Sequence, residues 1–340
     1  MRGVTLRLTG DAERDVDAVA AWLGDPDPGP AVVATSGSSG VPKRVVLSRE
    51  AVLASASASA ARLGGSGPWL LALPSSYVAG LNVVVRSLVA GHRPVVLGDR
   101  SPGDVPPDGG YLSLVPTQLH RWLDDPEDAA ALAALETVLV GGGPVDPALK
   151  VRAQDSGVRL VATYGMAETC GGCVYDGLPL DGVGVALAAD GRVRLTGPTL
   201  FDGYLDDPAA TAEVLVDRWY LTSDRGRLDE DGRLQVLGRL DDVVVSGGVN
   251  VSAAAVAARL REHPQVVEAE VVGLPDVEWG NRVVAVISGD LGLDEARAWV
   301  AEKHPRSWSP REVVVVPALP MLANGKVDRL ALRALAGGAR

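Results

Sequence analysis

The chain has 340 residues, of which 47% are hydrophobic, and it carries a formal net charge of −11. This length can bury a full core and predicts one large and one small domain, while the negative charge argues against nucleic acid or an anionic membrane as the main partner. Because the sequence has no run of 18 apolar residues and no signal-peptide layout at its start, we expect a cytoplasmic protein without membrane insertion.

The first elements are a helix, a strand and a second helix. Residues 11–23 predict an amphipathic helix with acidic residues at its start. The side chains expected on its buried face are Val16, Val19, Ala20 and Leu23. An apolar run at 31–34 predicts a buried strand, and residues 48–62, rich in Ala and Ser, predict a helix that can pack closely against a sheet.

Strands and helices then alternate as far as about residue 162. The expected strands are 69–73, 94–97, 111–115, 137–140 and 159–162, and the expected helices are 78–90, 116–123 and 145–154. Such alternation predicts an α/β fold with a largely parallel sheet that has helices on its faces. Ligands in such folds bind where the strands end.

After about residue 190 the pattern changes to short strands separated by turns, which predicts antiparallel sheet. We expect strands at 192–195, 219–222 and 234–237, followed by a hinge at 238–242. The remaining residues predict a small α+β domain, with helices at 252–262 and 294–303 and strands at 266–273, 282–288 and 312–316. We therefore expect two domains, 1–240 and 241–340.

The loop after the strand at 31–34 carries groups that suit a polyphosphate. Its hydroxyls and glycines can donate hydrogen bonds to anionic oxygens, and its lysine supplies a positive charge. The residues concerned are Thr35, Ser36, Gly37, Ser38, Ser39, Gly40 and Lys43. The spacing differs from the common nucleotide loop G-x-x-x-x-G-K-[ST] because Pro42 stands before the lysine. Taken alone, the loop is also compatible with a flexible surface turn.

Other polar motifs follow expected strands. Tyr164 stands beside a glycine and is suited to stack on a flat base, and Glu168 offers an oxygen ligand for Mg²⁺. Asp224 can accept hydrogen bonds from a ribose diol, and Arg239 can contact a phosphate or the ribose. For each of these residues a solvated turn or a local ion pair is the simpler alternative, and for Lys326 it is a solvated surface charge.

The two cysteines, Cys170 and Cys173, form a single C-x-x-C. No second pair and no clustered histidines accompany them, so the sequence argues against a zinc site. A redox pair and two small residues in a tight turn are the remaining interpretations, and the turn is favoured.

Taken together and in this order, the motifs resemble those of the adenylate-forming superfamily, which includes the AMP-binding acyl-CoA synthetases. The resemblance rests on 35–43, 164–168, 223–224, 238–242 and 324–326, and it extends from about residue 30 to 332. Residues 73–88, with Arg86, and residues 164–184 are similar to the o-succinylbenzoate–CoA ligases of menaquinone biosynthesis, in their short actinobacterial form.

This resemblance implies an AMP-forming acid–thiol ligase that uses ATP, Mg²⁺ and coenzyme A on an aromatic dicarboxylate. It implies Lys326 and Lys43 as catalytic residues, Glu168 as the Mg²⁺ ligand and Asp241 as the hinge of a mobile C-terminal domain. The ATP- and AMP-binding set is 35–40 and Lys43, with Gly142, Gly143, Tyr164, Gly165, Glu168, Asp224, Arg239 and Lys326. The substrate-binding set is Tyr77, Gly80, Asn82, Arg86, Gly142 and Thr163. The coenzyme A channel is Ser246, Gly247 and Gly248, and a homodimer is expected.

The sequence also departs from the family pattern. The region before the phosphate loop is short, Ala167 replaces a hydroxyl residue, and Tyr77 replaces a histidine of many ligases. Two alternatives therefore stay open: another aryl- or acyl-CoA synthetase or stand-alone adenylation enzyme, and a non-catalytic homologue that binds an acyl-adenylate.

Overall fold

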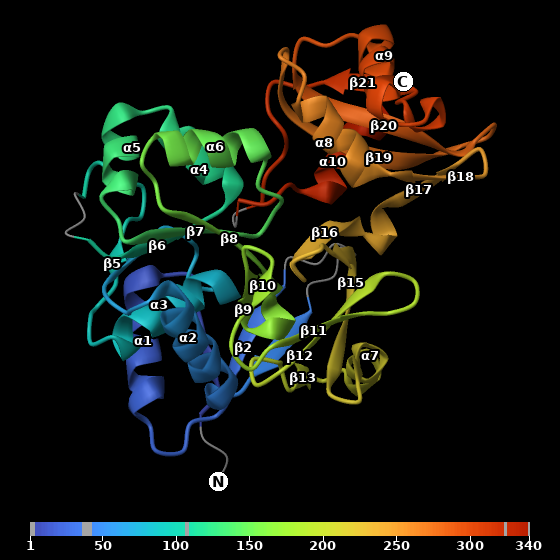
Figure 1. Cartoon of the computed structure of the whole chain (residues 1–340). Coiled ribbons are helices and arrows are strands. Elements are labelled where there is room, and N and C mark those ends of the chain that lie inside the picture. Colours follow the sequence, from blue (N-terminus) through green and yellow to red (C-terminus); the bar gives the residue numbers. More distant parts are fainter. Residues whose placement is uncertain (1–3, 36–42, 106–108, 323–324, 339–340) are drawn as a thin grey trace.

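The computed structural model describes residues 4–35, 43–105, 109–322 and 325–338. Figure 1 shows a large N-terminal part, coloured blue to yellow, and a smaller C-terminal part, coloured orange to red, that lies above it. Both views show the two parts joined near β16 (Leu234–Arg239). Within the described ranges, no helix has both the length and the apolar composition that a membrane crossing requires.

A seven-stranded sheet forms the centre of the large part. Its order is β10-β9-β8-β7-β6-β4-β5, in which β5, β4, β6, β7 and β8 run parallel and β9 and β10 run antiparallel to their neighbours. The strands are β4 (Trp69–Leu71), β5 (Val95–Val96), β6 (Tyr111–Leu114), β7 (Thr137–Val140), β8 (Leu160–Met166), β9 (Gly171–Tyr175) and β10 (Leu178–Pro179). The predicted α/β class with a largely parallel sheet is confirmed.

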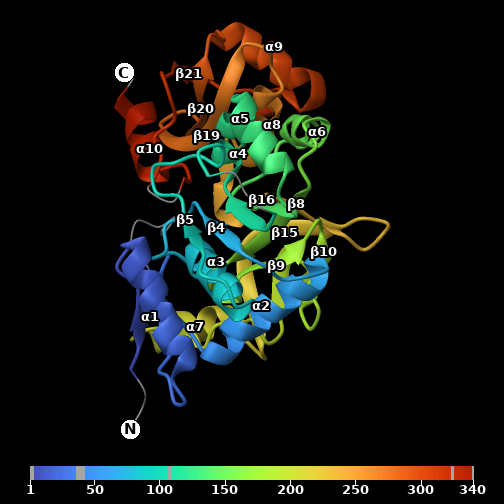
Figure 2. The same ribbon diagram turned by 90° about the vertical axis from the view of Figure 1, so that its left-hand side faces the viewer.

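Helices cover both faces of this sheet, as Figures 1 and 2 show. Trp69 and Leu71 point into one core and Leu70 into another, because neighbouring residues of a strand face opposite sides. The first core is closed by α1 (Ala12–Gly24), α2 (Arg49–Leu63) and α3 (Val78–Val89), and the second by α4 (Pro116–Leu123), α5 (Pro126–Ala133) and α6 (Pro147–Asp155). Burial on both faces explains why these strands read as continuous apolar runs.

The first helix buries a different stripe from the predicted one. Val16 and Val19 are buried as expected, but Ala20 is exposed and Trp22 and Asp15 are buried instead. Asp15 is tolerated inside because it accepts hydrogen bonds from Thr9 N, Thr9 Oγ1, Gly10 N and Ser75 Oγ at 2.6 to 2.9 Å. These bonds tie the helix to the start of the segment that leads into α3.

Two further sheets complete the large part. One has the order β1-β2-β3-β13, and the other the order β11-β12-β15-β14 with β16 paired to β15. Their strands are β1 (Leu6–Arg7), β2 (Ala31–Ala34), β3 (Arg44–Leu47), β13 (Gly203–Tyr204), β11 (Gly184–Leu187), β12 (Arg192–Thr196), β15 (Trp219–Leu228) and β14 (Leu215–Val216). The short helix α7 (Pro208–Val214) connects β13 to β14.

The C-terminal part has its own two cores, one on each face of the sheet β19-β20-β21. One core is closed by α8 (Ala253–Arg261) and α9 (Leu293–Lys303), the other by α10 (Arg329–Gly338). The strands are β19 (Val266–Asp276), β20 (Gly280–Gly289) and β21 (Glu312–Val315), and β17 (Val243–Ser246) and β18 (Val249–Ser252) form a hairpin beside them.

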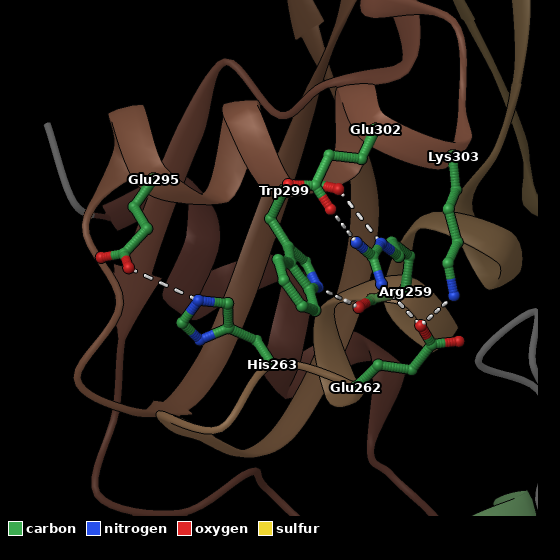
Figure 3. Close-up of polar contacts among 7 residues, drawn as sticks. All are labelled: Arg259, Glu262, His263, Glu295, Trp299, Glu302 and Lys303. Carbon is green, nitrogen blue, oxygen red and sulfur yellow. Dashed lines mark hydrogen bonds and ion pairs between the residues drawn. The ribbon is translucent and has the colours of Figure 1, made fainter.

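A buried arginine joins α8 to α9 (Figure 3). Arg259 is 4% exposed, bonds to Glu262 at 2.7 Å and Glu302 at 2.5 Å, and stacks 3.7 Å from the Trp299 ring centroid. The indole Nε1 of Trp299 donates to the carbonyl of Arg259 at 2.8 Å, and the Nε of Arg259 donates to the carbonyl of Trp299 at 3.0 Å. The buried guanidinium is tolerated because its charge is paired with two carboxylates and its Nε donor is also used.

Candidate active site

The loop proposed to hold phosphates lies between two strands that pair with each other. Strands β2 and β3 pair antiparallel on either side of it, and its base is closed by Thr35 N to Lys43 O at 2.9 Å and Lys43 N to Thr35 Oγ1 at 3.1 Å. The helix predicted at 48–62 is confirmed as α2, but the strand β3 that precedes it was not predicted. The predicted residues Ser36, Gly37, Ser38, Ser39 and Gly40 lie outside the described residues.

Strand β8 carries the predicted aromatic. The hydroxyl of Tyr164 donates to Asp224 Oδ2 at 2.6 Å, and burial, reinforced by this carboxylate, raises the pKa of Tyr164 well above its ordinary value. Gly165 is required beside it, since a Cβ there would lie 2.0 Å from the carbonyl oxygen of Gly171. The strand expected at 159–162 is longer than predicted: β8 continues to Met166 because β9 pairs with it, so Tyr164 lies within the strand and not after it.

Asp224 lies within a strand and not at its end. It belongs to β15, where it pairs with Arg239 of β16 in the antiparallel register. Its backbone N–H donates to Thr222 Oγ1 at 3.0 Å, next to an irregularity in the ladder between Arg225 and Gly226. Such irregularities often occur next to ligand sites, because they change the direction of neighbouring side chains.

Glu168 is a buried carboxylate held by an aromatic cluster. It is 7% exposed and lies in the short helix η1 (Ala167–Thr169) directly after β8. The hydroxyl of Tyr204 donates to its Oε1 at 2.7 Å, and Phe201 packs edge-on against Tyr204 and Tyr220. Burial, followed by the charge of Glu168, raises the pKa of Tyr204, so this hydroxyl stays a donor at neutral pH.

Tyr204 also contacts the phosphate loop, although the sequence analysis missed it. The Nζ of Lys43 lies 4.4 Å from the centroid of the Tyr204 ring, within the range of a cation–π contact. The segment Gly203-Tyr204 shows the same signal that drew attention to Tyr164, an aromatic beside a glycine. Lys43 thus lies against the ring of Tyr204, and Glu168 accepts a hydrogen bond from the hydroxyl of the same side chain.

Lys326 arrives at this site from the C-terminal part. Its pKa is lowered, chiefly because the surrounding protein removes water from the ammonium and further because of Arg239, while Glu168 and Asp224 oppose the shift. The residue as a whole is nevertheless exposed. Its turn is fixed by Leu322 N to Lys326 O at 2.8 Å and by a bridge between Met321 and Val327.

The glycines after β7 leave room for this lysine. Gly142 has φ +80, and a Cβ there would lie 3.3 Å from Lys326 Cε and 3.4 Å from Val115 Cγ1. Gly143 is exposed beside it, and Thr163 Oγ1 donates to the Val140 carbonyl at 3.3 Å on the neighbouring strand. The structure therefore brings Lys43, Glu168, Asp224, Arg239 and Lys326 to one edge of the large part, near Gly142 and Tyr164.

The expected acyl-binding stretch forms the start and core of α3. Tyr77 is the residue before the helix, and Gly80 is required because a Cβ there would lie 2.2 Å from the Pro74 carbonyl oxygen. Asn82 is buried and donates to the Cys170 carbonyl at 2.7 Å, which ties α3 to the turn after Glu168. Arg86 is also buried, and its Nη2 donates to the hydroxyl of Tyr175 at 3.2 Å.

The cysteines belong to the core beneath the site. Both are free and fully buried, and burial raises the pKa of each thiol to about 12. Protonated, inaccessible thiols are poor nucleophiles, which argues against the redox interpretation. Cys170 has φ 53 and occupies the turn between η1 and β9, as the favoured interpretation predicts, whereas Cys173 lies within β9 and not in the turn.

The remaining predicted residues lie around the connection to the C-terminal part. Ser246 ends β17, and Gly247 and Gly248, with φ 57 and 77, make the turn into β18. A Cβ at Gly247 would lie 2.7 Å from the ring of Trp279. Asp241 lies in the short helix η2 (Leu240–Asp242), and the next residue, Asp242, forms an ion pair with Arg329.

The carboxylate of Glu168 fits a magnesium ion that also binds phosphates. In the described part of the chain, no three His, Cys, Asp or Glu residues gather at metal-binding distances. Mg²⁺ is commonly held by one or two carboxylates together with substrate phosphates and water, so the single buried carboxylate of Glu168 is a sufficient protein contribution.

The comparisons with known proteins agree with this geometry. Residues 12–205 match the family model "AMP-binding enzyme" and residues 255–326 match "AMP-binding enzyme C-terminal domain". The probable 2-succinylbenzoate–CoA ligase of Mycobacterium tuberculosis is 44% identical over 326 residues, which cover 91% of this chain and 85% of that protein.

Two solved structures of o-succinylbenzoate CoA synthetase (MenE) from Bacillus subtilis are also similar. The complex with the acyl-adenylate intermediate OSB-AMP has a TM-score of 0.79 and 30% identity, covering 89% of this chain and 68% of that one. The complex with ATP and magnesium ion has a TM-score of 0.78 and 28% identity, covering 89% and 69%. With its sequence matched over most of its length and its fold shared with these structures, the chain belongs to the AMP-binding enzyme family.

Proposed function

We propose that this enzyme joins 2-succinylbenzoate to coenzyme A in two steps, through an acyl-adenylate and with release of pyrophosphate. The observation that carries the proposal is the position of Lys326, whose ammonium is within electrostatic reach of Glu168, Asp224 and Arg239. A cation delivered by the small domain to this edge is what an adenylation step needs. The similarity to ligases of this acid supports the choice of substrate, and menaquinone biosynthesis is the pathway that the resemblance implies.

The chemistry explains why positive charge is needed. A carboxylate is a poor acyl donor because its leaving group would be oxide. In the first step a carboxylate oxygen attacks the α-phosphorus of ATP and pyrophosphate leaves, and in the second the thiolate of coenzyme A attacks the acyl carbon and AMP leaves. The first step brings two anions together, so catalysis depends on positioning and on charge neutralisation.

The residues divide the work as follows in this proposal. Lys43 and the loop at 35–40 hold the leaving phosphates, Tyr164 stacks on adenine, and Asp224 and Arg239 hold the ribose. Glu168 holds Mg²⁺, which when bound supplies further neutralisation of phosphate charge. Lys326 bridges the carboxylate and the α-phosphate. Gly142, Gly143, Gly165 and Thr163 leave space for the acyl group and the nucleotide, and Tyr77, Gly80, Asn82 and Arg86 shape the acid site.

The proposed second step requires a different face of the small domain. We infer that residues 241–340 rotate about Asp241, relative to residues 1–240, and bring Ser246, Gly247 and Gly248 to the channel for coenzyme A. The separate cores on the two sides of the connection support such a division.

Pyrophosphate release, measured with and without coenzyme A over a panel of acids, tests the proposal. CoA-dependent release with 2-succinylbenzoate above all other acids is the expected result. A stronger response to another aromatic or aliphatic acid would point to a different acyl-CoA synthetase. Binding of acyl-adenylate with no release on any acid would identify a non-catalytic homologue. A homodimer and a cytoplasmic location stay predictions, which light scattering and cell fractionation address.

A further inference from the structure

Arg86 is a buried cation with little inside the protein to balance it. Its side chain is 8% exposed, and in the described part of the chain it has no acidic partner. Among the same residues its Nε finds no hydrogen-bond partner. The contacts that it does make are the hydrogen bond to Tyr175 OH at 3.2 Å and a cation–π contact with Trp69 at 5.2 Å.

Burying such a group lowers the stability of the fold unless an anion pairs with it. An unpaired buried charge loses its hydration without compensation, and an unsatisfied buried donor adds to the cost. Arg259 shows the alternative in the same chain, because it is equally buried but has two glutamates. The contrast indicates that the counter-ion of Arg86 comes from outside the protein.

Arg86 lies behind the turn that carries Glu168. Asn82, one turn earlier on α3, donates to the carbonyl of Cys170, which stands two residues after Glu168. The positive charge of Arg86 also acts on the Cys170 thiol and opposes the rise of its pKa. An anion bound by Arg86 would therefore sit under the same turn as the proposed adenylation site.

The guanidinium is held by a chain of contacts from three elements. Tyr175, at the end of β9 and 2% exposed, shares a hydrogen bond of 2.9 Å with Ser59 of α2. Ser59 is itself 1% exposed, so no water competes for this hydroxyl pair. Trp69 of β4, which stacks on Tyr111 at 5.0 Å, supports the guanidinium plane.

We propose that Tyr175, itself oriented by Ser59, is a positioning residue that aims Arg86 at the second carboxylate of the acid and so sets the preference for dicarboxylates. The inference rests on the proposed function for the identity of the acid. It assigns Tyr175 no contact with the reacting atoms. The ligand class is a dicarboxylate in which one carboxylate is activated and the other is held by Arg86.

The test compares two acids in three variants. The acids are 2-succinylbenzoate and its analogue in which the carboxylate that is not activated is a carboxamide. Tyr175→Phe removes the hydroxyl and keeps the ring, and Arg86→Met removes the charge and keeps most of the volume. Tyr111→Phe is the matched control, since it removes another buried tyrosine hydroxyl and leaves the bond between Tyr175 and Arg86 in place.

In Tyr175→Phe we expect KM for the dicarboxylate to rise about tenfold, with kcat for that acid and both constants for the carboxamide nearly unchanged. Arg86→Met should lower kcat/KM for the dicarboxylate by about 100-fold and abolish the preference between the acids. Tyr111→Phe should leave both acids unaffected. An equal loss on both acids in Tyr175→Phe, or no loss on either, would overturn the positioning role.

A second measurement separates this inference from the proposed function. It records how much each acid shifts the melting temperature of the enzyme when ATP and coenzyme A are absent. We expect the dicarboxylate to raise the melting temperature of the wild-type enzyme more than the carboxamide does. In Arg86→Met the two acids should have equal effects. This result supports the anion site even if turnover fails. Turnover failure alone would overturn the proposed function. Equal stabilisation of the wild type by both acids would overturn the inference.

Discussion

Tyr164 of β8 donates a hydrogen bond of 2.6 Å to Asp224 of β15, so a strand of the seven-stranded sheet is joined directly to a strand of the antiparallel sheet. The raised pKa of Tyr164 keeps its hydroxyl protonated at neutral pH, which leaves Asp224 the acceptor. One oxygen of the carboxylate, Oδ2, accepts from the tyrosine hydroxyl. In the proposed function the same carboxylate also binds the ribose of ATP.

This pair gives the first prediction. Asp224→Asn should raise KM for ATP about tenfold with a smaller effect on kcat, because it removes a charged acceptor from a ligand contact. Tyr164→Phe should have a weaker effect in the same direction. Asp190→Asn, in an exposed turn of the same sheet, is the control. Steady-state kinetics at varied ATP measure the effect, and an unchanged KM in Asp224→Asn would remove this residue from the nucleotide site.

Lys326→Ala should separate the two half-reactions. We expect adenylation to fall by a factor on the order of 10² or more, since a charge that stabilises the transition state is lost. Thioester formation from preformed acyl-adenylate should be spared. Lys303→Ala, an exposed lysine of the same domain, should change neither step. Equal loss in both half-reactions would contradict the role.

The lowered pKa of Lys326 adds a pH dependence to this prediction. Its charged form is the active one, so adenylation should decline as pH rises through a pKa that lies below the ordinary lysine value near 10.4. The decline should be absent from thioester formation that starts from acyl-adenylate.

Lys43→Ala should reduce adenylation more than thioester formation, because the proposed role of Lys43 is to orient the leaving pyrophosphate. Its ammonium lies against the Tyr204 ring, so loss of the charge leaves the aromatic cluster intact. Lys150→Ala, which breaks an ion pair with Asp176 away from the proposed site, is the control. Intact ATP binding and two intact half-reactions would refute the role of the loop.

Gly142→Ala should impair adenylation by crowding Lys326. A Cβ at Gly142 meets Lys326 Cε at 3.3 Å, whereas a Cβ at Gly64, which has nearly the same φ of +79, meets nothing within 4 Å. Both substitutions should cost about 1 kcal/mol of folding free energy because of the positive φ. Only Gly142→Ala should slow pyrophosphate exchange. If both substitutions slow pyrophosphate exchange equally, the loss comes from backbone strain and not from crowding of Lys326.

Asp15 should give the fold a stability that disappears in acid. Burial alone would raise its pKa, but hydrogen bonds from Ser75, Thr9 and Gly10 outweigh this effect and hold the pKa below its ordinary value. A depressed pKa contributes stability above the unfolded value, near 3.9, and this stability is lost as pH falls through the folded value. Asp15→Asn should therefore lower the free energy of unfolding by roughly 1–3 kcal/mol at pH 7 and by less below about pH 4. Urea unfolding at both pH values measures the difference, and a constant difference would contradict the linkage.

The sequence predicted those parts that depend on local patterns. The apolar run at β7 and the helix α4 have the predicted bounds, because strand burial and a proline at the helix start are local signals. The capped helix α5 and the strand β3 were missed. Asp125 and Pro126 are the signals that identify α5, whereas β3 is short and becomes a strand only by pairing with β2 and β13.

The sequence predicted which residues form the candidate site, but it predicted their arrangement less well. Lys43, Glu168, Asp224 and Lys326 were recognised from the order of their motifs, although Asp224 was expected at a strand end. Its place inside β15 follows from pairing with β16, a contact that no local pattern records. Tyr204 was missed for the same reason, because its importance comes only from partners far away in the sequence, Glu168 and Lys43.

The backbone contacts on either side of Lys326 also affect how this lysine is positioned. The bridge between Met321 and Val327, and the bond from Leu322 to Lys326, fix the turn of this lysine to a domain whose sheet has a packed core on each face. In the proposed rotation about Asp241, the ammonium is therefore carried at the end of a rigid arm whose pivot is at that residue. A few degrees of error at the pivot displace the lysine by a distance proportional to the arm, so substitutions far from the chemistry should be felt first as a misplaced charge.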